Sequence, residues 1–131
     1  KYYAKMQTPY TPSIPHMFGF KYILDQIDKE GLDNRWRRHQ EMAEFTRKWA
    51  LEHGQGLFPE KGFESTTITC IHNQQRWDIN QINDKLLARG FRMDRGYGKL
   101  RGEAFRIAHM GNIMLDDIKE YLQHFDEVIN D

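Results

Sequence analysis

The sequence predicts an α+β domain in which helices pack on a small, mainly antiparallel sheet. Apolar residues recur at helical steps in four segments, and short strand-like segments lie between the last three of them. Hydrophobic residues make up 39% of the 131 residues and charged residues 29%, which supports one packed core beneath a polar surface. A chain of this length is expected to form a single compact domain.

Residues 7–15 are predicted to form an extended arm, because three prolines within positions 9–15 remove backbone donors and keep the preceding residues extended. Apolar residues at three- and four-residue steps then predict a helix from position 16 that ends at Gly31. A second, longer amphipathic helix is predicted over residues 32–54. The start at Lys1 rather than methionine indicates a piece of a longer protein.

The middle of the chain is predicted to alternate strands with one helix. Residues 57–58 predict a short strand, and residues 65–72 predict a longer one because β-branched side chains dominate there. Asp78, with Gln81 three positions later, predicts a capped helix that ends at Gly90.

The last third predicts a hairpin followed by a closing helix. Residues 91–93 and 104–110 are the predicted strands, and the glycine-rich segment 96–102 is the turn between them. Apolar residues at helical spacing predict an amphipathic helix over residues 115–129.

Arg106 is the most informative single residue for function. Side chains alternate along a strand, so Phe105 and Ile107 point to one side while Arg106 and Ala108 point to the other. An arginine in so apolar a run requires an anionic partner, and a carboxylate matches the guanidinium in shape. That partner is either a bound ligand or an aspartate or glutamate of this chain.

The arm carries three hydroxyl groups, on Thr8, Tyr10 and Thr11, which a proline-stiffened segment can direct toward a phosphate. An exposed linker with incidental hydroxyls is the alternative interpretation. The segment Gly96-x-Gly98-Lys99 lacks the spacing and context of a phosphate-binding loop and is interpreted as a turn.

Composition argues against several classes of protein. Nineteen basic and nineteen acidic residues balance, so no basic excess indicates nucleic acid binding. The six histidines are scattered and Cys70 is the single cysteine, which argues against a metal site and a disulfide and favours a reducing compartment such as the cytoplasm. No apolar run reaches membrane-spanning length, and no self-contained catalytic centre is evident.

Three segments together resemble the class V pyridoxal-phosphate (PLP) aminotransferases, in particular alanine-glyoxylate, serine-glyoxylate and serine-pyruvate aminotransferases. They are residues 7–15 (QTPYTPSIP), 30–39 (EGLDNRWRRH) and 105–111 (FRIAHMG). The resemblance implies the small C-terminal domain of a fold-type-I PLP-dependent transferase. Residues 1–15 would be an inter-domain arm and residues 16–131 the C-terminal small domain. The large domain and its Schiff-base lysine would lie upstream, so we expect this piece alone to be inactive.

The resemblance also implies roles for individual residues. Arg106 aligns with the arginine that holds the substrate α-carboxylate. Thr11 aligns with a hydroxyl residue that reaches the cofactor phosphate of the other subunit in a homodimer, and Thr8 is a second candidate for that contact. The implied reaction moves an amino group from alanine or serine to glyoxylate or pyruvate in the cytoplasm.

Three alternatives remain open from the sequence. A phosphonate or phosphoserine aminotransferase would use extra basic residues such as Arg95, Lys99 or Arg101. A stand-alone α+β binding module would use Tyr97, Lys99 and Arg101 to contact single-stranded nucleic acid. A partner-recognition domain would expose the arm over residues 1–15.

Overall fold

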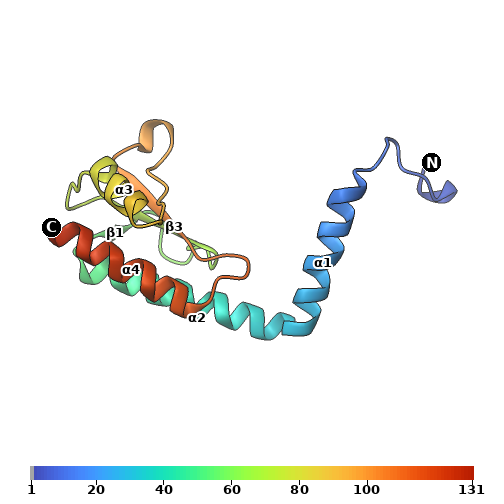
Figure 1. Cartoon of the computed structure of the whole chain (residues 1–131), viewed down its shortest axis with the longest axis horizontal. Helices are drawn as coiled ribbons and strands as arrows, with labels where there is room; N and C mark the ends of the chain where they lie inside the picture. The colour runs from blue at the N-terminus through green and yellow to red at the C-terminus, as the bar shows by residue number, and fades with distance from the viewer. Residues whose placement is uncertain (1) are drawn as a thin grey trace. The chain divides into compact units, whose positions relative to one another are not determined.

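The computed structural model describes residues 2–131, and Figure 1 labels most of its helices and strands. The single compact domain expected from the length is not what the structure has, because the chain divides into two compact units, Lys1–Trp36 and Arg37–Asp131. The helix α2, Leu32–Glu52, contributes residues to both units.

The first unit holds a short 3-10 helix, η1 (Tyr3–Lys5), and the helix α1 (Ile14–Glu30). The predicted first helix is therefore confirmed, and it begins two residues earlier than expected because Pro15 fits the first turn. Gly31 ends it with a φ of 81°, and its N–H donates to the carbonyl of Ile27 at 2.8 Å. No residue of α1 is buried.

The second unit is built on a three-stranded antiparallel sheet in the order β1-β2-β3. The strands are β1 (Gly56–Leu57), β2 (Ile68–His72) and β3 (Ala104–Ala108). The β2/β3 register places Cys70 opposite Arg106 and Ile71 opposite Phe105. The predicted antiparallel sheet is confirmed.

Two helices of this unit begin at the predicted places. In α3 (Ile79–Ala88), the Asp78 carboxylate accepts hydrogen bonds from the backbone N–H groups of Asn80 and Gln81 at 3.1 and 3.0 Å. In α4 (Leu115–Asn130), the Met114 N–H donates to the Asp117 carboxylate at 2.7 Å. In both helices a carboxylate accepts hydrogen bonds from backbone N–H groups at the helix start.

The strand predicted over residues 91–93 is wrong. The backbone there bonds to α3 instead of to the sheet: Phe91 N–H donates to the Leu86 carbonyl at 2.9 Å, and Met93 N–H donates to the Asn83 side chain at 3.4 Å. Among residues 91–94, only Asp94 bridges to β3, at Arg106. The turn region follows as expected and contains a 3-10 helix, η2 (Gly98–Leu100).

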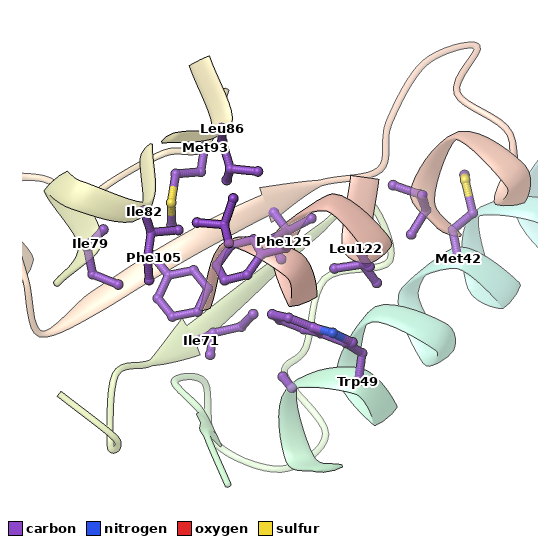
Figure 2. Packing of buried hydrophobic residues seen from close by; sticks show 14 residues of the cluster. Met42, Trp49, Ile71, Ile79, Ile82, Leu86, Met93, Phe105, Leu122 and Phe125 are labelled. Atoms are coloured by element: carbon purple, nitrogen blue, oxygen red, sulfur yellow. The ribbon is translucent and has the colours of Figure 1, made fainter. Parts of the chain in front are cut away.

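One core joins the helices α2, α3 and α4 to one face of the sheet (Figure 2). At its centre the rings of Phe105 and Phe125 stack with centroids 5.9 Å apart. Trp49 meets Phe125 edge-on at 4.9 Å. Ile71 projects from β2 onto the same cluster and is fully buried. Across the described residues, no helix is long and apolar enough to span a bilayer.

Candidate functional site

Arg106 lies in the middle of β3, on the sheet face opposite the core. Its neighbours Phe105 and Ile107 are 0% and 3% exposed, whereas the Arg106 side chain is 41% exposed. The predicted alternation along this strand is confirmed. Two buried neighbours therefore fix the backbone that carries the guanidinium.

Asp94 is the anionic partner of Arg106 within the chain. The Asp94 Oδ2 lies 2.5 Å from Arg106 Nη2, and the Arg106 backbone N–H donates to the Asp94 carbonyl at 3.0 Å. The second carboxylate oxygen, Oδ1, accepts the Gly96 N–H at 2.9 Å. The hydrogen bond from Arg106 lowers the pKa of Asp94, and the bond to Asp94 raises the pKa of Arg106, so both groups stay charged.

This ion pair lies at the edge of a groove of about 540 Å³. Arg92 also lines the groove, and its apolar walls include Phe91, Ile113 and Ile118. Asp94 engages a single nitrogen of the Arg106 fork, and the other side-chain N–H groups have no partner within the described part of the chain. Arg106 can therefore accept a second anion.

Two further polar side chains border this region. Tyr121 lines the groove, and its buried hydroxyl has no hydrogen-bond partner among residues 2–131. Burial raises the Tyr121 pKa far above its ordinary value, so the hydroxyl remains a neutral donor. Burial also raises the pKa of the Cys70 thiol across the strand pair, which opposes a nucleophilic role for that cysteine.

The hydroxyl residues of the arm belong to the first unit, whereas Arg106 belongs to the second. Thr8 Oγ1 donates to the Tyr10 carbonyl at 2.6 Å. Both residues and Thr11 are exposed. Within the described chain, no group of three or more histidine, cysteine or carboxylate residues could hold a metal ion.

Sequence reasoning missed Asp94 and Tyr121. Asp94 could have been found, because extending the predicted hairpin by one residue places it beside Arg106 on the neighbouring strand. Tyr121 carried no signal, because its spacing on α4 is that of an ordinary core residue.

The helices and small antiparallel sheet of this chain have the fold of the small C-terminal domain of fold-type-I PLP-dependent transferases. Comparison with solved structures supports this class. An alanine-glyoxylate aminotransferase from Nostoc sp. matches with a TM-score of 0.74 and 26% identity, over 81% of this chain and 29% of that one. A pyridoxamine-pyruvate aminotransferase from Mesorhizobium loti shares the fold with a TM-score of 0.83, over 94% and 32% of the two chains.

Sequence comparison agrees with the fold. An uncharacterized aminotransferase of Methanocaldococcus jannaschii is 34% identical over 113 residues, which is 85% of this chain and 29% of that protein. The serine-glyoxylate aminotransferase of Arabidopsis thaliana is 32% identical over 110 residues, 80% and 27% of the two chains. No protein-family model matches the sequence. The chain belongs to the class V aminotransferases, corresponds to a C-terminal part of them, and spans less than a third of the length of these relatives.

Proposed function

We propose that this chain is the substrate-carboxylate-binding domain of a PLP-dependent aminotransferase that moves an amino group from an amino acid to a small 2-oxo acid. The observation that carries the proposal is the partly exposed Arg106 fork at the edge of a groove, with N–H groups left over after its contact to Asp94. Relatives named as glyoxylate aminotransferases support glyoxylate as an acceptor.

Arg106 acts by binding and orientation. A planar carboxylate pairs with two N–H groups of one guanidinium, which fixes the direction of the substrate as well as its position. Since the pKa of Arg106 is raised by Asp94, the guanidinium keeps its proton and takes no part in proton transfer. The apolar walls of the groove limit the water that competes for the carboxylate.

Bound PLP would supply the electron-withdrawing ring of the reaction. In this proposal the Schiff-base lysine belongs to the large domain, outside this chain. Thr11 and Thr8 are proposed to donate hydroxyl hydrogen bonds to the cofactor phosphate across a homodimer. Both are exposed, and Thr8 would have to exchange its present bond to the Tyr10 carbonyl for the one to the phosphate. Residues 1–15 would then be the inter-domain arm and residues 16–131 the C-terminal domain, in a cytoplasmic enzyme.

The relatives differ in their amino donor. Three of these enzymes are named for the transfer of an amino group to glyoxylate from serine, aspartate or alanine. Alanine and serine, with glyoxylate or pyruvate as acceptor, are the substrates that the resemblance implies for this chain, and a panel of donors tests them. We expect the 131-residue chain alone to catalyse no transamination.

The experiment that tests the proposal places Arg106→Gln in a polypeptide that also supplies the rest of a class V aminotransferase. We expect kcat/KM for an amino acid to fall by a factor that corresponds to about 2 to 5 kcal/mol. Lys119→Gln on the exposed side of α4 is the control and should leave activity unchanged. An amine substrate without a carboxylate should be insensitive to Arg106→Gln, and equal losses on both substrates would disprove the assigned role.

A further inference from the structure

A second cavity lies beside the Arg106 groove, on the loop that precedes β3. Its volume is about 630 Å³, and its lining includes the three arginines Arg92, Arg95 and Arg101 together with Asp94. Arg92 and Asp94 line both cavities, so the two spaces are neighbours. We call the second one the loop pocket.

The loop pocket carries uncompensated positive charge. Its one carboxylate, Asp94, already pairs with Arg106, and its three arginines have no carboxylate partner within the described residues. The whole chain has a formal net charge of zero, so three guanidiniums around one cavity are a local concentration rather than a general excess.

Specific contacts fix the conformation of this loop. Arg95 is half-buried, and its Nη1 donates to the Asn80 side chain of α3 at 3.1 Å. Gly96 has a φ of 79°, and a Cβ atom there would lie 2.4 Å from the Ala104 carbonyl oxygen and 2.5 Å from that of Leu100. Only glycine permits this close backbone approach, so the packing of the loop against β3 defines the pocket.

We infer that the loop pocket binds a second anionic group on a substrate whose α-carboxylate is held by Arg106. This inference rests on the proposed aminotransferase function, but it replaces alanine and serine as the expected amino donors with amino acids that end in another carboxylate or in a phosphate. Glyoxylate has a single carboxylate and no second anionic group, so the pocket serves the other substrate of the pair. Guanidinium groups suit both kinds of anion, because each offers oxygens that accept paired N–H groups.

The test titrates the 131-residue chain, labelled with nitrogen-15, with inorganic phosphate, succinate or acetate at constant pH and ionic strength. We expect phosphate and succinate to shift the backbone amides of residues 92–101 saturably. The double variant Arg92→Gln/Arg101→Gln should weaken the binding of phosphate and of succinate by at least about fivefold, because two of the three charges are lost. The matched control, Lys21→Gln/Lys48→Gln, removes the same charge from exposed helix positions and should bind as the wild type does.

The outcomes separate the loop pocket from the proposed role of Arg106. Arg106→Gln should abolish the acetate response near Arg106 while phosphate still shifts residues 92–101. Phosphate binding without succinate binding would assign the pocket to phosphate-bearing donors, and the reverse would assign it to dicarboxylates. Absence of saturable binding, or equal weakening in the lysine control, would overturn the inference and leave the Arg106 proposal intact. Tighter binding of a single-stranded oligonucleotide through the same two arginines would also overturn it.

Discussion

Arg106 and Asp94 are joined twice, through their backbones at 3.0 Å and through their side chains at 2.5 Å. The backbone contact is the only bridge that residues 91–94 make to β3 among the described residues. The same short contact therefore closes the edge of the sheet and places a negative charge against the guanidinium. Any carboxylate that binds Arg106 meets Asp94 as a neighbour and a competitor.

Replacing Asp94 by Asn tests this competition. Asparagine keeps the shape of the side chain and can still accept the Gly96 N–H, but it removes the charge. We expect carboxylate binding at Arg106 to tighten by about twofold or more, since a like charge near the ligand is removed. Acetate titration followed by nuclear magnetic resonance measures the change.

Asp116→Asn is the matched control, because that carboxylate lies on α4 beside Lys119 and is 90% exposed. It should leave acetate binding unchanged. Weaker acetate binding in Asp94→Asn would show instead that Asp94 is needed to orient Arg106.

Phe105→Ala should destabilise the second unit. Phe105 is fully buried and stacks on Phe125 in the core, so truncation leaves a cavity between β3 and α4. The expected loss in the free energy of unfolding is about 3 to 5 kcal/mol, measured by urea denaturation. Phe63→Ala is the control, because Phe63 is 79% exposed and its change should stay within about 0.5 kcal/mol of the wild type.

Asp126 ties α4 to α2 through a single carboxylate oxygen. Its Oδ1 accepts the Trp49 indole N–H at 2.6 Å and lies 3.1 Å from His53 Nε2. Asp126→Ala leaves the indole donor of a mostly buried ring unpaired, so we expect a loss of about 1 to 2 kcal/mol. Tryptophan fluorescence during urea unfolding reports both the loss and the changed environment of Trp49. Glu120→Ala, on the exposed side of the same helix, should be neutral, and a loss equal to that of Asp126→Ala would contradict the assignment.

His109 makes stability depend on pH. Burial lowers its pKa in the folded chain, and Thr69 bonds its Nε2 at 2.8 Å. Above the ordinary pKa of 6.5 neither state is protonated and stability is fully present. As pH falls below that value, the unfolded chain binds a proton that the folded chain does not, so stability decreases until the pH reaches the folded pKa.

Unfolding measured by urea between about pH 5 and 8 should show this decline, and His109→Gln should flatten it. His16→Gln, an exposed residue at the start of α1, is the control and should retain the wild-type profile. An unchanged slope in His109→Gln would assign the pH dependence to other groups.

Sequence patterns predicted those parts of the fold that depend on local physics. The Asp78 cap, the helical spacing of α3 and α4, and the in-out alternation of β3 are all present. Each follows from the chemistry of residues only a few positions apart. The strand prediction for residues 91–93 was wrong because it depended on a contact distant in sequence. The backbone there bonds to Asn83 and Leu86 of α3, and no local pattern indicates those bonds.

The sequence predicted one of the two charged residues that form the candidate site. The sequence singled out Arg106 and its need for an anion, and it left open whether that anion belonged to this chain. In the structure, Asp94 of the same chain pairs with Arg106, and both residues line a groove. Arg106 therefore has an internal partner and is also open to a ligand. Arg92, Arg95 and Arg101 gather around one cavity only because Gly96 folds the loop back against β3.

By itself the sequence determined the type and order of most elements, the family, and the strand position that presents a guanidinium away from the core. These depend on periodicity, capping and recognisable segments, which are properties of neighbouring residues. The tertiary structure alone decided which acid meets Arg106, how the sheet edge closes, and that three arginines share a pocket. Those relationships arise from the packing of α3, the loop and β3. Packing brings together residues from separate segments, so no single segment of the sequence predicts it.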